Sequence, residues 1–182
     1  MICLGIESTA HTFGVGIVSS KGNILANVKR VFTTEQGGMI PTEVAEHHKK
    51  IAKQVIDEAI ITAKIKPEDI SLVSYSRGPG ISPCLHVGFN HAKELAESLK
   101  KPLIPVNHCI AHLEVGKMQT GAKDPVLLYA SGANTQIIAY EGGKYRIFGE
   151  TLDQGVGNFL DSFARYMGLG FPGGPKVYEL SL

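Results

Sequence analysis

The chain has 182 residues, of which 43% are hydrophobic and 19% are charged, so we expect a packed globular core. Its net charge of +1 argues against a free-standing nucleic-acid binder, because such proteins usually carry an excess of basic residues. A nucleic-acid substrate stays open if partner subunits supply the charge. The opening MICLGIES is strand-like and lacks a basic segment, so we expect no signal peptide, and without an apolar run of about 18 residues we expect no membrane span. Three cysteines without a CxxC pair indicate a reducing, cytoplasmic setting.

The first two thirds of the chain alternate between short apolar runs and helical patterns. A hydroxyl-rich turn, STAHT at 8–12, follows the first apolar run, and SKGN at 20–23 predicts a hairpin turn. Helical spacing begins at Thr42, which we expect to be the N-cap, and a break precedes it at residues 37–41. Predicted strands are residues 2–6, 13–19, 24–32, 70–76 and 102–106, and predicted helices are residues 42–65 and 83–100.

The last third repeats the opening pattern. A strand at 125–130 leads into a small-residue turn, SGANT, then a hairpin of strands 136–140 and 144–148 and an amphipathic helix at 156–169. At an offset of 123 residues, four identities support a duplication. They pair Ser8 with Ser131, Ala10 with Ala133, Thr12 with Thr135 and Lys21 with Lys144. We therefore expect a duplicated α/β domain, with a first lobe at 1–124 and an incomplete second lobe at 125–182.

The stretch VNHCIAHLE, residues 106–114, carries two histidines four residues apart. On a helix, His108 and His112 would share one face and could bind one divalent metal through neutral imidazoles. A polar helix start is the alternative, and a bare HxxxH pattern favours it because this spacing often occurs by chance.

Two hydroxyl turns, STAHT and SGANT, predict phosphate binding if they act as a pair. Such turns present backbone N–H groups and hydroxyls to an anion, so Ser8 and Thr9 could contact phosphate while Glu7 holds a metal-bound water. Ordinary hairpin turns are the alternative. The glycine-proline loops RGPG and FPGGP could each place backbone against a ligand, or could simply end a helix or strand.

Together these motifs resemble the TsaD-type tRNA threonylcarbamoyltransferases, in the archaeal and eukaryotic branch that works within the KEOPS complex, a family once called O-sialoglycoprotein endopeptidase. The matching pieces occur in family order over the whole chain. They are GIESTAHTFGVGIV, HH at 47–48, RGPG, VNHCIAHLE, LLYASGANTQIIAY, YRIFGETLD, VGNFLDSFARY and FPGGP. The resemblance implies a duplicated actin-like ATPase fold with ribonuclease-H-like cores. It also implies transfer of threonylcarbamoyl from its adenylate to the exocyclic amine of an adenosine beside the tRNA anticodon.

The resemblance implies specific site residues and partners. One divalent metal, iron or zinc, would be held by His108, His112 and Tyr129, and an adenine nucleotide or threonylcarbamoyl-adenylate would be bound, with magnesium where a nucleotide needs it. Implied partners are tRNA, a KEOPS-type kinase and small dimerising subunits. The implied nucleotide-binding residues are Tyr129, Ala130, Ser131, Gly132, Ala133, Asp161 and Gly174.

Several positions depart from the family pattern. Ala133 replaces a glycine, Ser162 a lysine, Tyr178 a glutamate and His86 an arginine. Family members also continue further and supply an aspartate metal ligand and an asparagine near the nucleotide. These departures favour the alternative of a non-catalytic, dimerising scaffold of the same fold.

Two further alternatives fit less well. A sugar-kinase-like ATPase would leave the histidine pair unexplained. A metalloprotease would need glutamate directly after the first histidine, where Cys109 stands.

Overall fold

The structure, a computed structural model, describes residues 1–34 and 39–182, so the predicted break at 37–41 lies partly outside the described residues. Contacts divide the chain into two compact units. The first contains Met1–Phe32 and Met39–His108, and the second contains Cys109–Leu182. The division falls earlier in the chain than the predicted lobe boundary at 124/125.

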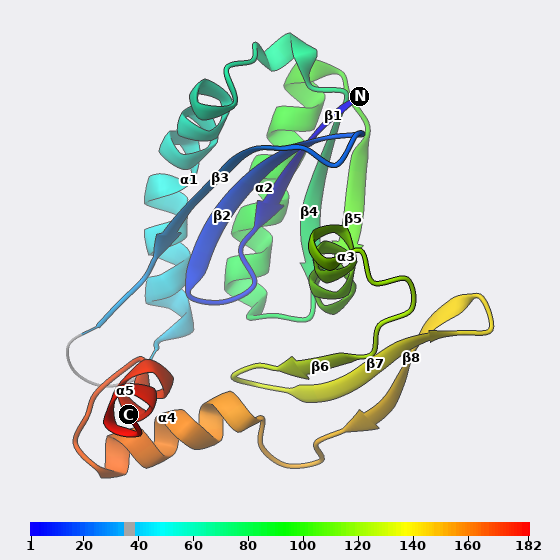
Figure 1. The fold of residues 1–182 in the computed structure, drawn as a ribbon. Coiled ribbons are helices and arrows are strands. Elements are labelled where there is room, and N and C mark those ends of the chain that lie inside the picture. The colour runs from blue at the N-terminus through cyan, green and yellow to red at the C-terminus, as the bar shows by residue number, and fades with distance from the viewer. Residues whose placement is uncertain (35–38) are drawn as a thin grey trace. The chain divides into compact units, whose positions relative to one another are not determined.

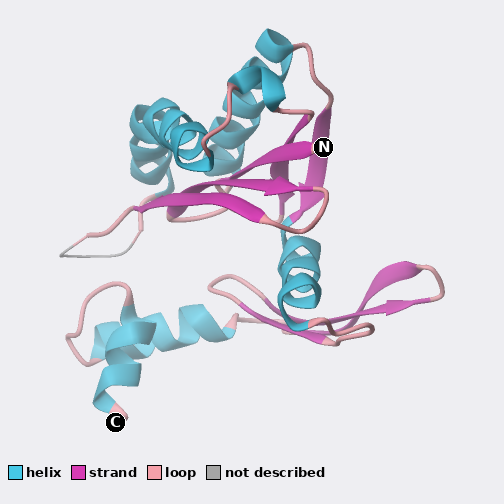
Figure 2. Ribbon diagram, turned by 45° about the horizontal axis from the view of Figure 1, so that its top comes forward, coloured by secondary structure: helices cyan, strands magenta, loops and turns pink. Residues whose placement is uncertain are grey.

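The first unit is a five-stranded mixed sheet with two long helices on one face (Figures 1 and 2). The strand order is β3-β2-β1-β4-β5; β1, β2 and β3 form an antiparallel meander, whereas β4 and β5 continue the sheet parallel to β1. The elements are β1 (Ile2–Glu7), β2 (Thr12–Ser19), β3 (Ile24–Val31), α1 (Pro41–Ala63), a 3-10 turn (Pro67–Asp69), β4 (Leu72–Gly78), α2 (Ser82–Leu99) and β5 (Leu103–Asn107).

Apolar alternation along β1 and β2 builds the core of this unit. Leu4 and Ile6 of β1, with Phe13, Val15 and Ile17 of β2, are buried on the face that α1 and α2 cover. Alternate residues of a strand point to opposite faces, so these side chains share one face of the sheet. The predicted strands and helices of this unit are confirmed to within a few residues.

The start of α1 differs from the prediction. Pro41 occupies the first helical turn and Ile40 is the N-cap, without a side-chain capping hydrogen bond, so the predicted Thr42 cap is wrong. Proline is favoured at this place because its fixed φ suits the helix and it lacks an N–H that would be unsatisfied there. At the other end, Lys64 closes the helix in the left-handed conformation, with φ of 54°.

The second unit begins with helix α3 (His108–Thr120), whose residues from Cys109 onward belong to it, and continues into a three-stranded antiparallel meander. Its core gathers Cys109 and Leu113 of α3 and Ile138 of β7, with Leu127, Tyr129 and Tyr145 around them. The other elements are β6 (Leu127–Ala130), β7 (Thr135–Glu141), β8 (Lys144–Glu150), α4 (Val156–Tyr166) and α5 (Gly173–Leu180).

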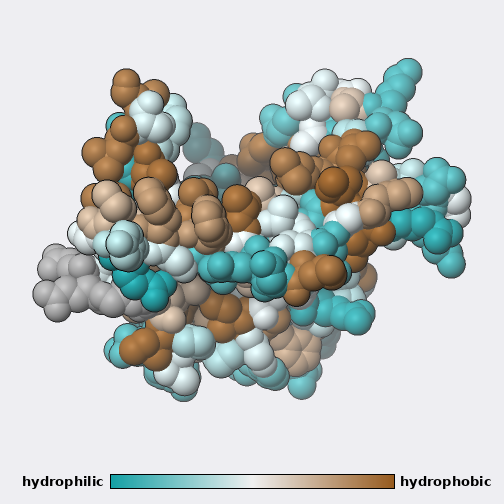
Figure 3. Space-filling view, turned by 90° about the horizontal axis from the view of Figure 1, so that it is seen from below, coloured by the Kyte–Doolittle hydropathy of each residue, from teal (hydrophilic) through white to brown (hydrophobic). Residues whose placement is uncertain are grey.

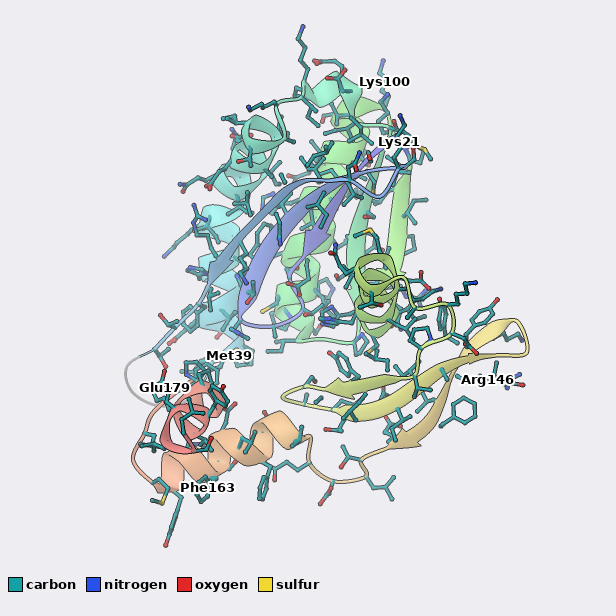
Figure 4. All side chains as sticks on the ribbon, viewed as in Figure 1. Lys21, Met39, Lys100, Arg146, Phe163 and Glu179 are labelled. Atoms are coloured by element: carbon teal, nitrogen blue, oxygen red, sulfur yellow. The ribbon has the colours of Figure 1, made fainter. Side chains whose placement is uncertain are left out.

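Helix α5 is not predicted from the sequence, and helix α4 has an exposed apolar side. Phe159, Phe163 and Tyr166 lie at the surface, and Figure 4 labels Phe163. Figure 3 shows apolar atoms gathered on the face of the molecule seen from below. The amphipathic pattern of this segment therefore predicts its helix correctly, although these aromatic side chains are not buried in the described chain.

The two units share the predicted repeat. Each contains an antiparallel three-stranded meander followed by a helix, β1–β3 with α1 and β6–β8 with α4. The offset of 123 places Thr12, the first residue of β2, on Thr135, the first residue of β7. Lys21 lies in the hairpin turn between β2 and β3 (Figure 4), and its repeat partner Lys144 begins β8. None of the helices in the described ranges has the length and apolarity needed to cross a membrane.

Candidate functional site

In the first unit, the polar residues predicted to form a site lie where parallel strands end. Strands β1, β4 and β5 run parallel, so their last residues Glu7, Gly78 and Asn107 meet at one edge of the sheet. The carboxyl edge of a parallel sheet is where ligands bind in open α/β folds. The hydroxyl turn after β1 and the start of α3 at His108 both belong to this edge.

A short hydrogen-bonded chain joins Glu7 to His108 through Thr9. The Thr9 backbone N–H donates to Glu7 Oε1 at 2.7 Å, and the Thr9 hydroxyl donates to the same oxygen. Thr9 Oγ1 in turn lies 3.4 Å from His108 Nε2. The structure therefore brings together three of the predicted residues, and the threonine positions the histidine ring. The predicted contact of Glu7 and Thr9 with phosphate or metal-bound water stays a prediction.

Ser8 has a different environment from its neighbours. It is only 1% exposed, and its hydroxyl donates to the Cys84 carbonyl of α2 at 3.0 Å. A methyl group added at Gly88 would lie 2.1 Å from Ser8 Oγ, and one added at Gly80 would lie 2.6 Å from the Thr9 carbonyl. The two glycines thus allow α2 and the RGPG loop to approach the hydroxyl turn closely, which fixes its path.

His48 is a fully buried polar side chain behind this turn. Its Nε2–H donates to the Ala10 carbonyl at 2.8 Å, and its ring lies 5.7 Å from that of Phe13. Burial lowers the pKa of His48 below its usual range, and the neighbouring His47 also lowers it, while the Ala10 hydrogen bond and Glu7 partly oppose the shift. The imidazole is therefore held neutral and anchors α1 to the hydroxyl turn.

The neutral state of His48 predicts a loss of stability in acid. Because the folded-state pKa is lower than the unfolded value of about 6.5, the unfolded chain binds more protons as pH falls below 6.5. We expect the free energy of unfolding to decrease from pH 7.5 to 5.5, and the His48→Gln variant to lose less over that range. Denaturant titrations at both pH values measure this, with His86→Gln, an exposed histidine, as the control. An unaltered pH slope in His48→Gln would refute the assignment.

In the second unit, the remaining predicted metal ligands lie together. His112 is one helical turn after His108 on α3, and its ring centroid lies 5.6 Å from that of Tyr129 on β6. Burial raises the pKa of the Cys109 thiol, and a hydrogen bond with Tyr129 partly opposes this shift. Residues four apart on a helix share a face, so the helix presents two imidazoles on one side.

This donor set fits a divalent metal in part. Two imidazole nitrogens and a phenol oxygen are ordinary ligands for zinc or iron. Within residues 1–34 and 39–182, however, no cluster of three or more histidine, cysteine or acidic side chains is arranged to hold a metal. Metal binding by His108, His112 and Tyr129 therefore stays a prediction.

The SGAN turn at 131–134 is hydrogen-bonded to the start of α4. The N–H groups of Gly157 and Asn158 donate to the carbonyls of Ser131 and Gly132, each at 3.0 Å. The Val156 N–H donates to the Thr135 hydroxyl at 2.9 Å. The first N–H groups of the helix are thus satisfied by the turn, and the turn is fixed by them.

Two glycines that were not predicted as functional from the sequence make this close contact possible. A methyl group at Gly157 would lie 2.8 Å from the Cα and N of Gly132, and one at Gly155 would lie 2.5 Å from the Asn134 N. The GVG sequence at the start of the helix is the signal that could have identified them. In the described chain, the N–H groups of Gly132 and Ala133 have no hydrogen-bond partner. Two consecutive N–H groups of this kind can receive one anion.

Asp161 and the FPGGP loop also come together. Asp161 Oδ1 accepts a hydrogen bond from the Gly173 N–H at 2.8 Å, next to Gly174 at the start of α5. A methyl group at Gly173 would lie 2.4 Å from the Cβ of Ala164, so glycine is required there. The predicted nucleoside contacts of Asp161 and Gly174 stay predictions, and the structure shows that Asp161 also fixes the loop.

The fold agrees with solved structures of very different sequence. YeaZ from Pseudomonas aeruginosa superimposes with a TM-score of 0.57 at 15% identity, covering 82% of this chain and 65% of that one. A ROK family glucokinase from Streptomyces griseus superimposes with a TM-score of 0.51 at 16% identity, covering 86% and 50%. The protein therefore has the actin-like ATPase fold, as predicted, with His108 directly after the last strand of its first sheet.

The sequence assigns the chain to a family within this fold. A family profile described as TsaD, tRNA N6-adenosine threonylcarbamoyltransferase, matches residues 23–182, and the chain belongs to this family. A relative of that name from Thermococcus kodakarensis is 55% identical over all 182 residues, which are 55% of its own length. A probable bifunctional tRNA threonylcarbamoyladenosine biosynthesis protein from Methanothermobacter thermautotrophicus is 52% identical, with 34% of its length covered. The chain spans about half the length of the curated relatives it matches, or less.

Proposed function

We propose that the protein transfers the threonylcarbamoyl group from threonylcarbamoyl-adenylate to the exocyclic amine of an adenosine in tRNA. The observation that carries the proposal is the 55% identity over the whole chain with relatives named for this reaction. The polar turns that the sequence predicts as phosphate sites add support, since each is held by close glycine contacts in its own unit.

Within the first unit, we assign the carboxyl edge of the sheet to the reacting carbonyl. Thr9 holds the His108 ring and is itself held by Glu7, so the imidazole is oriented before substrate arrives. In metal sites, such partners fix the tautomer and the direction of a ligating histidine. A divalent metal held by His108, His112 and Tyr129 would supply Lewis-acid polarisation of a carbonyl.

Within the second unit, we assign the adenylate to the turn at 131–134. The N–H groups of Gly132 and Ala133 are directed to the phosphate, and hydrogen bonds to α4 keep them in place. Gly174, beside the loop that Asp161 fixes, is assigned to the nucleoside. A nucleotide bound in this way needs no rearrangement of the turn, which favours positioning of the reacting group.

The reaction is an acyl transfer. The adenosine amine attacks the carbamoyl carbon, a new carbon–nitrogen bond forms, and the bond from that carbon to the phosphate oxygen breaks. AMP leaves, and the amine loses one proton. AMP is a good leaving group, so the demands on the protein are orientation and stabilisation of the charge on the carbonyl oxygen.

The partners and setting belong to the same proposal. With a net charge of +1, the chain offers little charge for a polyanion, so we propose that KEOPS-type subunits hold most of the tRNA. We assign the protein to the cytoplasm, since three cysteines without a CxxC pair suit a reducing setting.

A non-catalytic scaffold is the second candidate, and the departures from the family pattern favour it. Ala133 adds a methyl group to the phosphate turn, and Tyr178 is 64% exposed where the family has a carboxylate. Ser162 accepts a hydrogen bond from Gln154 at 3.4 Å and carries no charge. A scaffold of this kind would bind nucleotide without transferring the acyl group.

A transfer assay separates the two candidates. Protein expressed from its natural gene is incubated with threonylcarbamoyl-adenylate and unmodified tRNA, and the digested tRNA is examined by mass spectrometry. We expect threonylcarbamoyladenosine to form, and Thr9→Val to slow its formation because the His108 ring loses the hydroxyl that orients it. Binding of the adenylate with no modified nucleoside would reject the transferase and support the scaffold.

A further inference from the structure

A hollow of about 500 Å3 lies at the carboxyl edge of the first sheet and is not used by the assignments above. Its lining residues come from the last positions of two neighbouring parallel strands, Arg77 and Gly78 of β4 with Pro105 and Asn107 of β5. Gly78 is paired with Asn107 in the sheet. The hollow therefore brings a guanidinium and a carboxamide together, directly before His108 in the chain.

The guanidinium of Arg77 is available to a ligand. Among the described residues, none forms a hydrogen bond or a salt bridge with the Arg77 guanidinium. Glu7 is the acid at the end of the neighbouring strand β1, and its Oε1 already accepts two hydrogen bonds from Thr9. Gly78 has a φ of 143°, which disfavours any side chain at that position, and as a glycine it leaves the hollow open between the strand ends.

These groups are suited to a carboxylate. A guanidinium presents two parallel N–H donors that match the two oxygens of a carboxylate, and a carboxamide adds a further N–H donor. A nucleic-acid backbone presents a row of phosphates and needs several cations, whereas this hollow offers one. The geometry thus favours a single small anionic group over an RNA strand.

We propose that Arg77 and Asn107 form the subsite for the free carboxylate of the threonyl group. The inference rests on the proposed function, because it takes threonylcarbamoyl-adenylate as the ligand. In that molecule the carboxylate lies only three bonds from the carbamoyl carbon, and Asn107 directly precedes His108, the residue assigned to that carbonyl. The subsite explains how the enzyme selects an amino-acid acyl group over a neutral one.

The test compares two non-hydrolysable sulfamoyl analogues of the adenylate, one with the free threonyl carboxylate and one with a carboxamide in its place. We expect calorimetric titration of the protein to show that the acid binds about tenfold more tightly or better, as charge-assisted hydrogen bonds give. In Arg77→Gln the preference is lost while the carboxamide analogue binds as before. Arg77→Lys, which keeps the charge without the paired donors, recovers part of the preference.

Arg165→Gln is the matched control, since Arg165 is also exposed and its guanidinium has no hydrogen-bond or salt-bridge partner within the described residues. It should leave both affinities unchanged. Equal binding of the two analogues by the unaltered protein, or a preference that survives in Arg77→Gln, overturns the subsite while the proposed function stands. Failure of both analogues to bind overturns both proposals. Weaker and less salt-dependent tRNA binding by Arg77→Gln, with the acid preference intact, would assign Arg77 to RNA instead.

Discussion

Replacing His108 and His112 together by alanine should remove about one equivalent of bound zinc or iron from the protein. The two imidazoles lie one turn apart at the start of α3, and no other histidine, cysteine or acidic cluster in the described residues can take the ion. With both nitrogens gone, a phenol from Tyr129 is the sole remaining ligand of the set, and a neutral phenol binds zinc weakly. Metal content by elemental mass spectrometry, after dialysis against a weak chelator, measures the loss.

The control for this prediction is the pair His86→Ala and His91→Ala on α2. These histidines have the same chemistry, but they contact Ser82 and Glu94 of their own helix. The control should retain its metal. Circular dichroism and denaturant titration verify that both double variants are folded. An unchanged metal content in the His108 and His112 variant would refute the assignment of the metal site.

Adding one methyl group at Gly157 should disrupt the adenylate turn. In Gly157→Ala the new carbon would lie 2.8 Å from backbone atoms of Ser131 and Gly132, and backbone cannot move aside as a flexible side chain can. Overpacking of this kind costs about 1–3 kcal/mol of stability. The turn must separate from α4, so Gly132 and Ala133 lose the fixed direction of their N–H groups. We expect the free energy of unfolding to fall by this amount and adenylate affinity to fall by about tenfold or more.

Gly116→Ala is the matched control for this change. Gly116 lies in α3, and a methyl group there would meet no atom within 4 Å. Alanine favours a helix interior over glycine by up to about 1 kcal/mol, so this variant should be equally or more stable. If Gly157→Ala keeps the stability and adenylate affinity of the unaltered protein, the turn is not held as the structure indicates.

Strands and hairpins could be predicted well because their physical signals are local. The alternation that buries Leu4, Ile6 and Val15 can be read in the sequence, and the SKGN turn fixes the hairpin after β2. The duplication could also be predicted, since it rests on the order of elements and on pairs such as Thr12 and Thr135. Neither inference depends on long-range contacts.

Features that depend on distant contacts could not be predicted. The sequence shows His48 on the apolar face of a helix, but the Ala10 carbonyl that accepts its hydrogen bond lies 38 residues away in the chain. Helix α5 begins inside a PGGP run that looks like a loop, and the hydrogen bond from the Gly173 N–H to Asp161 fixes its start. Arg77 and Asn107 likewise line the same hollow only because β4 and β5 are neighbours in the sheet.

The most direct test of the proposed function is a single-turnover measurement with two labels. Threonylcarbamoyl-adenylate carries one label in the threonyl group and another in the adenine. It is mixed with excess protein and tRNA. We predict that one AMP is released for each threonyl label that enters tRNA, and that the His108 and His112 double variant lowers both together. Release of AMP with no threonyl label in tRNA would contradict the account.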